Sequence, residues 1–336
     1  MRVKYIRFTT KLMLVWFDKL TTSAFSFLCP FVLSLSKDTN GFHKKFIIIL
    51  LFAFRTYSFC PLNRADLVVF SYDRPLQLYS FLESVKKYIF GIEEIHVIYR
   101  VSNNEFEAGY DIVKKDFANI IFHKQVKVDD FRLLTLESIF NSVSKYIIFG
   151  VDDIIVKDYV NLGTCINYLE KSNSYGFYLR MGKNIVECYM HFNESTPVPK
   201  MNQVSQNIFQ WLFTDGKGDW KYPNNVDMTI YRKFDLKQLY NYNFQNPSAL
   251  EAVWADNANY NQKGLCFKQS KIVNLPLNLV IDEDRNLDNR NSSLFSTKEL
   301  LDKFMSGFKI DITKFYKINN LAPHAAIVPT FVPRTI

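Results

Sequence analysis

The feature that most constrains the fold is an alternation of short apolar runs and amphipathic segments over residues 66–169. The apolar runs, rich in β-branched and aromatic residues, are typical of buried strands, and they lie at 66–71, 95–99, 120–123 and 146–151. Segments with apolar residues at helical spacing follow them, at 75–89, 106–117, 131–143 and 159–169. This order predicts an α/β fold with a mostly parallel sheet, right-handed crossovers and helices on both faces.

The fourth apolar run continues to residue 156 but is interrupted by Asp152 and Asp153. Two acids at the end of a buried strand are costly unless a cation meets them, and a metal ion that holds a diphosphate is one such partner. The alternative is a loop with two solvated acids. Ligands of open parallel sheets bind at the carboxyl ends of the strands, which favours a ligand site. Three further polar residues follow the first strand at that edge: Ser71, Asp73 and Arg74.

Composition excludes several classes of protein. The chain has 336 residues, 48% of them hydrophobic, which is enough for a sizeable core and argues against disorder. Its net charge of +8 favours anionic partners, but without an Arg-rich stripe or an RNA-binding aromatic motif we expect no nucleic acid. No glycine-rich dinucleotide or phosphate-binding loop follows the first strand. The five cysteines have no paired spacing and predict neither a disulfide framework nor a zinc site.

Residues 1–62 differ from the rest of the chain. Lys44 and Lys45 precede a nine-residue apolar run, 46–54, which is too short to span a bilayer. Charge followed by a short apolar run resembles the start of a signal peptide, although it begins late in the chain. We expect a poorly ordered targeting or anchoring leader over 1–62 and one domain over 63–330. Within that domain a nucleotide-binding half covers 63–160 and an acceptor half covers 171–330.

Four segments resemble glycosyltransferases of the GT-A fold, and they also resemble a group of uncharacterised bacterial GT-A-like proteins. Residues 149–153 stand at the place of the DxD motif of that fold, with Val151 where the first acid would fall. The other segments are 69–75, then 179–184 with 219–223 and Asp227, and finally 246–251 with 273–278. Segments 218–223 and 246–251 mix aromatic, amide and acidic residues, which suits a wall that binds sugar rings or an ordinary surface loop.

The resemblance implies transfer of a sugar from a nucleotide-diphosphate sugar to an acceptor hydroxyl, with Mn²⁺ or Mg²⁺ on the leaving diphosphate. Asp153 would be the direct metal ligand and Asp152 a second ligand or a ribose contact. His324 is a further candidate ligand, because some GT-A enzymes complete the metal shell with a late histidine; a packed structural histidine is the alternative. Ser71, Asp73 and Arg74 would line the nucleotide pocket, or Asp73 would simply close a turn before the helix.

If the enzyme inverts the anomeric centre, a carboxylate must take the acceptor proton. Glu251 is the preferred base and Asp227 the second candidate, and a solvated surface acid is the alternative for each. Arg180 would contact an acid or the acceptor. We expect a glycan or lipid-linked acceptor in cell-surface glycan synthesis, and a cytoplasmic protein with membrane association through 1–62. The rival readings are a nucleotidyltransferase and a catalytically inactive membrane-peripheral binding protein.

Overall fold

The computed structural model describes residues 64–188, 194–278 and 295–334. The chain divides into two units after Pro61, and every described residue belongs to the second unit. The leader expected over 1–62 therefore lies outside the described residues. No helix among the described residues combines the length and apolar character needed to cross a bilayer.

The first half of the unit has the alternating order that the sequence predicts. Its main elements are β1 (Ala65–Tyr72), α4 (Pro75–Tyr88), β3 (Ile92–Arg100), α5 (Asn104–Asp116), β4 (Ile121–Lys124), α6 (Asp130–Phe140), β5 (Tyr146–Val151) and α7 (Leu162–Ser172). The helix expected at 159–169 begins later, because Val160 and Asn161 form a short strand, β7, against β2 (Ile89–Phe90). The Asn161 side chain then caps α7 by accepting the Thr164 N–H at 3.0 Å.

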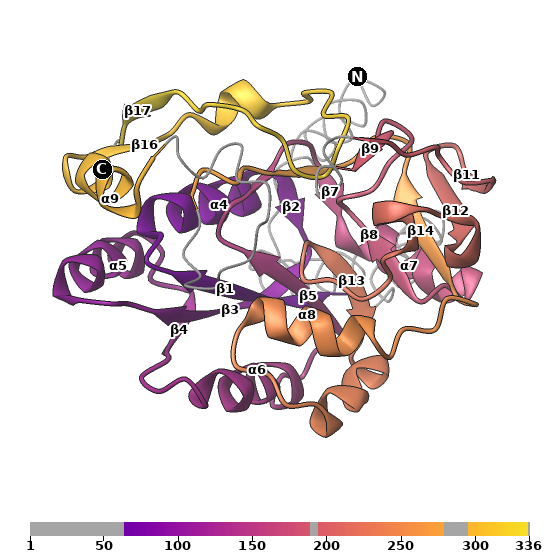
Figure 1. The fold of residues 1–336 in the computed structure, drawn as a ribbon, viewed down its shortest axis with the longest axis horizontal. Coiled ribbons are helices and arrows are strands. Elements are labelled where there is room, and N and C mark those ends of the chain that lie inside the picture. The colour runs from indigo at the N-terminus through magenta and orange to yellow at the C-terminus, as the bar shows by residue number, and fades with distance from the viewer. Residues whose placement is uncertain (1–63, 189–193, 279–294, 335–336) are drawn as a thin grey trace, which may run out of the picture. The chain divides into compact units, whose positions relative to one another are not determined.

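These elements build one half of a nine-stranded sheet within the described residues (Figure 1). Strands β4, β3, β1 and β5 lie side by side in that order and run parallel. The α/β fold class is therefore confirmed. Because β3 pairs with one side of β1 and β5 pairs with its other side, the order in which strands are added to the sheet reverses between β1 and β5. In open α/β sheets this switch point opens a crevice at the carboxyl ends of the strands.

The other half of the sheet is mixed rather than parallel. It contains β8 (Gly176–Tyr178), β11 (Met201–Ser205), β12 (Ile208–Leu212), β13 (Thr229–Arg232) and β14 (Lys263–Phe267). Strand β13 runs antiparallel to both β5 and β8, and so it carries the second half of the chain back alongside the acid-tipped strand. This places the segment before β13 at the same edge as the end of β5.

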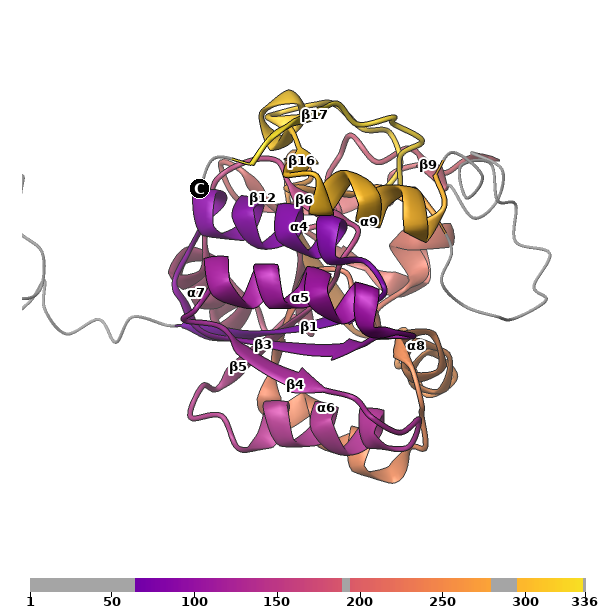
Figure 2. The ribbon, with the colours of Figure 1, turned by 90° about the vertical axis from the view of Figure 1, so that its left-hand side faces the viewer.

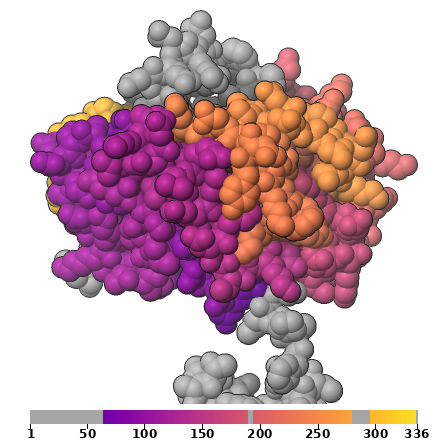
Figure 3. All heavy atoms as spheres, turned by 90° about the horizontal axis from the view of Figure 1, so that it is seen from below, coloured from indigo at the N-terminus to yellow at the C-terminus, as the bar shows by residue number. Residues whose placement is uncertain are grey.

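Two hydrophobic clusters cover the two faces of the sheet. Alternate residues of β1 separate them: Leu67 and Val69 face one cluster, and Val68 and Phe70 face the other. Helices α4, α5, α7 and α9 (Thr297–Met305) contribute to the first cluster, and α6, the 3₁₀ segment η5 (Lys233–Asn241) and α8 (Pro247–Ala255) contribute to the second. Figure 2 shows α4 and α5 on one side of the strands and α6 on the other. Figure 3 shows the second face, where the orange η5–α8 region lies against the magenta α6 region.

Gly150 brings α4 close to the end of β5. A Cβ atom built at this position would lie 2.8 Å from the Phe81 ring of α4, closer than real side chains approach. The glycine therefore lets the first turns of α4 lie against the strand that ends in the two aspartates. It fixes the distance between the two walls of the switch-point crevice.

Candidate active site

The two aspartates lie in a turn between β5 and β6 (Ile154–Val156), where the chain leaves the main sheet. Strand β6 pairs antiparallel with β15 (Ile272–Asn274), with Asn274 opposite Ile154. The Leu275 N–H also donates to the Asp153 carbonyl at 2.8 Å. A strand more than 100 residues away in sequence therefore brings an amide side chain to the acid pair.

Both carboxylate oxygens of Asp152 already have donors from the protein. Oδ2 accepts the Ser71 hydroxyl at 2.8 Å and the Tyr72 N–H at 3.3 Å, and Oδ1 accepts Arg74 Nη1 at 3.0 Å. Burial raises the pKa of Asp152, while Arg74 and Ser71 oppose that rise. The hydrogen bonds of Asp152 connect the end of β1 to the end of β5. Its role as a metal ligand stays a prediction.

Arg74 is a buried guanidinium held from two sides. Besides Asp152 it contacts Asn278, donating Nε–H to Oδ1 at 2.9 Å and Nη2–H to the carbonyl oxygen. Its Nη1 is 3.8 Å from Asp153 Oδ2. The Ser71 hydroxyl at the end of β1 lies 2.6 Å from the Tyr110 hydroxyl of α5. Residues from β1, α5 and the start of α4 therefore meet at the site. Beyond Asn278 the chain enters residues 279–294, which lie outside the described residues.

Asp73 has the local role that its turn position suggested. Its backbone is left-handed, with φ of 53°, a conformation that aspartate tolerates better than most residues. The side chain accepts the Ser102 N–H at 2.9 Å, which ties the turn after β1 to the turn after β3. A contact with a nucleotide stays a prediction for this residue.

Asp153 is the less satisfied member of the doublet. Its side chain is 15% exposed, and its contacts with two polar side chains are long: Arg74 at 3.8 Å and Asn274 Nδ2 at 3.4 Å. Burial raises the pKa of Asp153 to about 7, with Asp152 and Asp227 adding to the rise and Arg74 opposing it. Asp153 is therefore a carboxyl group whose ionised form is disfavoured mainly by burial.

Arg180 forms the centre of a second cluster. Its Nη1 donates to Asp227 Oδ2 at 2.9 Å, its Nη2 pairs with Asp219, and its guanidinium lies 5.9 Å from the Tyr222 ring centre. Arg180 and Asp227 are buried, with 3% of the arginine side chain exposed, whereas Asp219 and Tyr222 are partly buried. The sequence left Arg180 open between an acid partner and the acceptor, and the structure shows two acid partners.

Asn274 joins the two clusters. Its Nδ2 donates to Asp227 Oδ1 at 3.2 Å as well as approaching Asp153. Met228, the residue after Asp227, has a left-handed backbone with φ of 53°, which is strained for a side chain of its size. This turn, held by the Met228 N–H on the Phe149 carbonyl at 2.8 Å, aims Asp227 at the end of β5.

Glu251 lies in α8 and reaches the same region. Asn246 caps α8 by accepting the Ala249 N–H at 2.8 Å, and Pro247 occupies the first turn, which explains the Asn-Pro pair in the sequence. Glu251 Oε1 accepts the Val226 N–H at 2.7 Å. Burial raises the pKa of Glu251 to about 8, with Asp227 adding to the rise. Glu251 is therefore a partly buried carboxyl group with a raised pKa beside the Arg180 cluster rather than a solvated surface acid.

His324 also falls at this edge. It forms an isolated bridge with Asn274, whose N–H donates to the Pro323 carbonyl at 3.0 Å. Burial lowers the pKa of His324, and the negative charges of Asp227 and Asp219 oppose that change. The structure thus brings His324 near the predicted site, while its role as a metal ligand stays a prediction.

The donor set fits an oxygen-seeking cation beside Asp153. Asn274 Nδ2 lies between two carboxyl groups, those of Asp153 and Asp227, and Asn274 Oδ1 is buried without a hydrogen-bond partner. Mg²⁺ and Mn²⁺ sites in such enzymes need only one or two carboxylates, with phosphate oxygens and water for the rest. Among the described residues, Asp152, Asp153 and His324 do not form a compact group of three metal-ligating side chains. A metal here would therefore need further oxygen ligands from water or from a bound molecule.

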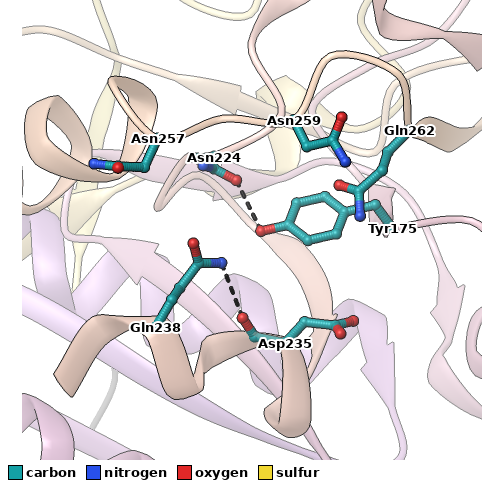
Figure 4. Close-up of a pocket in the computed structure, with 7 residues that line it drawn as sticks. All are labelled: Tyr175, Asn224, Asp235, Gln238, Asn257, Asn259 and Gln262. Carbon is teal, nitrogen blue, oxygen red and sulfur yellow. Dashed lines mark hydrogen bonds between the residues drawn. The ribbon is translucent and has the colours of Figure 1, made fainter. Parts of the chain in front are cut away.

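Two cavities lie near these clusters. A crevice beside the doublet has no space for a water molecule; it is lined by Gln77, Asp152, Asp153, Ile155, Leu275, Leu277 and Ile310. A second cavity of about 130 Å³ lies beyond the end of α8 (Figure 4), lined by Tyr175, Asn224, Asp235, Gln238, Asn257, Asn259 and Gln262. In Figure 4 the Tyr175 hydroxyl donates to Asn224 Oδ1, a bond of 2.8 Å. This second cavity shares no lining residue with the acid clusters.

Several residues of the site were not singled out by the sequence. Asn274 and Asn278 stand in a segment that carried the GT-A resemblance, but an isolated asparagine gives no signal of its position in space. Tyr110 stands on a helix face that reads as ordinary core. The tryptophan expected near a sugar wall, Trp220, is fully buried and donates to the Ile185 carbonyl at 3.1 Å, so it belongs to the core.

The sequence of the chain was compared with those of known proteins. No family model matches the chain. A curated protein of Dictyostelium discoideum, the bifunctional glycosyltransferase pgtA, is 29% identical over 195 residues, covering 53% of this chain and 25% of that protein. The chain thus spans about a quarter of the length of this relative. The resemblance to glycosyltransferases that the four segments indicated is confirmed by this similarity in sequence.

Solved structures give weaker likenesses. S. aureus TarS 1–349 in complex with UDP has 12% identity and a TM-score of 0.42, covering 62% of this chain and 58% of that one. The mannosyltransferase PcManGT from Pyrobaculum calidifontis, in complex with GDP-Man and Mn²⁺, has 6% identity and a TM-score of 0.36, covering 65% and 61%. The fold class of this chain follows from its own strand order rather than from these likenesses.

Proposed function

We propose that the chain is a glycosyltransferase that moves a sugar from a nucleotide-diphosphate sugar to an acceptor hydroxyl group. The observation that carries the proposal is the convergence of carboxyl and guanidinium groups at the carboxyl edge of the sheet, at its switch point. The similarity to pgtA, which is named as a glycosyltransferase, supports the same reaction class. The acids come from four separate segments of the chain: Asp152 with Asp153, Asp219, Asp227, and Glu251.

The donor diphosphate would bind at the Arg74 side of the site. Arg74 is fixed by Asp152 and Asn278, and its charge lies 3.8 Å from Asp153. A Mn²⁺ or Mg²⁺ ion, when bound by Asp153 with Asn274 and Asp227 nearby, would neutralise charge on the departing diphosphate. Burial, with the charges of Asp152 and Asp227, raises the pKa of Asp153, and such a cation would favour its ionised form. Ser71 and Asp73 shape the same turn.

Glu251 is the better candidate for the base of an inverting reaction. Asp227 already accepts from Arg180 and Asn274, whereas Glu251 has a pKa of about 8, so its ionised form, which becomes more populated as the pH rises toward 8, is a stronger base than an ordinary carboxylate. The acceptor oxygen would lose its proton to Glu251 and bond to the anomeric carbon. The bond from that carbon to the diphosphate oxygen would break at the same time. Asp227 and Arg180 would then act as positioning residues.

The acceptor and the cellular role belong to the proposal as well. We expect a glycan or lipid-linked acceptor, in the synthesis of cell-surface glycan. Membrane association through residues 1–62 stays a prediction, because those residues lie outside the described part of the chain.

The test is a screen of UDP-, GDP- and CMP-linked sugars with Mn²⁺ or Mg²⁺, in which release of the nucleotide and sugar transfer are both followed. The Glu251→Gln variant keeps the Val226 contact but cannot accept a proton, so we expect retained donor binding and a loss of transfer of about 10²–10⁴-fold. Asp256→Asn, which changes an acid just beyond α8, is the matched control and should keep wild-type turnover. Wild-type transfer by Glu251→Gln would eliminate Glu251 as the base.

The same screen separates the rival functions. A nucleotidyltransferase would release pyrophosphate from a nucleoside triphosphate and a sugar phosphate, and would leave nucleotide sugars intact. An inactive binding protein would bind a nucleotide or a glycan without any turnover. Either outcome would overturn the proposed transfer reaction.

A further inference from the structure

A second group of titratable side chains lies at the opposite end of the parallel strands. Asp66 stands at the start of β1, and Glu94 and His96 stand in β3. These residues alternate with Leu67 and Val97 of the α4 face, so all three point to the face that α6 covers. The candidate active site is at the carboxyl ends of β1 and β5, whereas this cluster is at their amino ends.

Asp66 is fully buried but only half satisfied. Its Oδ1 accepts the Ser144 hydroxyl at 2.7 Å and the Glu94 N–H at 3.2 Å. Its Oδ2 has no hydrogen-bond partner, and the residue has 0% exposure. A buried carboxylate oxygen without a partner is costly, which indicates that something outside the protein chain meets it.

A ring nitrogen of His96 lies close to the carboxyl groups of Asp66 and Glu94. Its Nδ1 lies 3.1 Å from His123 Nε2, and the two rings stack with centres 5.4 Å apart. When Nδ1 donates that hydrogen bond, Nε2 keeps its lone pair. Nε2 is buried without a hydrogen-bond partner, and it lies 3.4 Å from Glu94 Oε2. A metal-ligating imidazole usually donates its other ring N–H to a fixed acceptor, and His123 Nε2 can serve as that acceptor here.

We propose that Asp66, Glu94 and His96 bind a divalent transition-metal ion of the zinc type, distinct from any cation at the donor site. One ligand atom from each residue lies within 4.8 Å of the others. Tetrahedral zinc holds its nitrogen and oxygen ligands at about 2.0–2.2 Å, so a small inward movement of the exposed Glu94 side chain closes the site. The imidazole ligand favours zinc, cobalt or nickel over Mg²⁺ and Ca²⁺, which prefer oxygen alone.

The role that follows is structural. The ion would join the start of β1 to β3, two neighbouring strands in the middle of the parallel half of the sheet. It would also give Asp66 Oδ2 and His96 Nε2 the partner that each lacks. Three protein ligands leave one position for water.

The test is titration of the full chain, stripped with a chelator, with ZnCl₂ by calorimetry, together with the thermal midpoint in the presence and absence of zinc. We expect one zinc ion per chain and a rise in the midpoint, since a ligand of the folded state stabilises it. Glu94→Gln should weaken binding by at least about tenfold, as loss of a direct ligand exceeds the effect of an outer partner. Glu93→Gln, its exposed neighbour, is the matched control and should bind as the wild type does.

Two further variants keep the result unambiguous. Asp153→Ala should bind zinc with unchanged affinity, because the two sites lie at opposite ends of the strands. His96→Gln should abolish binding. Equal zinc affinity in the wild type, Glu94→Gln and His96→Gln would overturn the proposal, and so would binding that is lost only in Asp153→Ala.

Discussion

The two arginine-centred clusters of the candidate site use the same chemistry in different ways. Arg74 holds Asp152, which also accepts from Ser71 and a backbone N–H, so that the acid keeps other donors if the arginine is removed. Arg180 holds Asp219 and Asp227 at once. Asp227 has one further donor in Asn274, and Glu251 lies beside it with a raised pKa.

The difference teaches how one edge of a sheet can serve two tasks. The Arg74 cluster is built from β1, β5 and the first turn of α4, and its fixed charges suit a phosphate-bearing ligand. The Arg180 cluster is built from loops of the second half, and burial beside it raises the pKa of Glu251 to about 8, which suits a group that must exchange a proton. Asn274 lies between the two and ties their geometry together.

The largest expected effect is the loss of stability when the central arginine of each cluster is replaced. Arg180→Met leaves two buried carboxylates without their cation, and we expect the free energy of unfolding to fall by about 3–5 kcal/mol. Arg74→Met should cost less, about 1–3 kcal/mol, because Asp152 keeps its Ser71 and Tyr72 donors. Urea denaturation followed by circular dichroism measures both.

The control is Arg64→Met, which removes an exposed ion pair with Glu93 and should cost about 1 kcal/mol or less. If Arg180→Met cost no more than Arg74→Met, the two clusters would not differ in the way described.

The second prediction concerns pH. The pKa of Glu251 is raised from 4.5 to about 8, so between these values the folded state holds a proton that the unfolded state has released. Stability should therefore fall as the pH rises through this window, by at most about 1.4 kcal/mol per pH unit for one proton. Glu251→Gln should remove this contribution up to about pH 8. Asp153→Asn should remove a similar one only up to about pH 7, matching the pKa of Asp153.

The measurement is the free energy of unfolding from pH 5 to 9, with each variant subtracted from the wild type at every pH. Parallel curves for the wild type and Glu251→Gln would contradict a raised pKa at Glu251. Identical windows for the two variants would remove the distinction between the clusters.

The smallest expected effect sharpens the description of the Arg74 side. Ser71→Ala removes one hydrogen bond to Asp152 and one to Tyr110, and should cost about 0.5–1.5 kcal/mol because both partners keep other donors. We also expect weaker donor binding, since Asp152 then holds Arg74 less firmly. Ser80→Ala, which removes a buried bond to the Leu76 carbonyl within α4, is the matched control. Ser80→Ala should leave donor affinity unchanged, and an equal loss of affinity in both variants would refute a specific role for Ser71.

The sequence predicted the parallel half of the fold because its strands are continuous apolar runs and its helices have one apolar face. It also predicted that Ser71, Arg74 and Asp153 would share an edge, since the carboxyl ends of parallel strands do so. Helix ends were less accurate: α7 begins after Asn161 because a two-residue strand, β7, comes first. Such a short pairing leaves no periodic signal.

The mixed half could not be predicted in the same way. Strand β13 joins the sheet antiparallel to β5, and nothing in its four residues sets that direction. The left-handed backbone at Met228 and the pairing of β15 with β6 depend on contacts between distant segments. Glu251 and Asp227 were selected through a family resemblance. That they lie near Arg180 became visible only in three dimensions.

The most direct test of the central claim is calorimetric titration of the full chain with UDP- and GDP-sugars, with and without Mn²⁺, for the wild type and Asp153→Ala. The account predicts that the wild type binds at least one donor, more tightly when Mn²⁺ is present. It predicts that Asp153→Ala keeps its fold but loses the manganese-dependent part of the affinity. Donor binding of equal strength in both proteins, or no binding of any nucleotide sugar by the wild type, would contradict it.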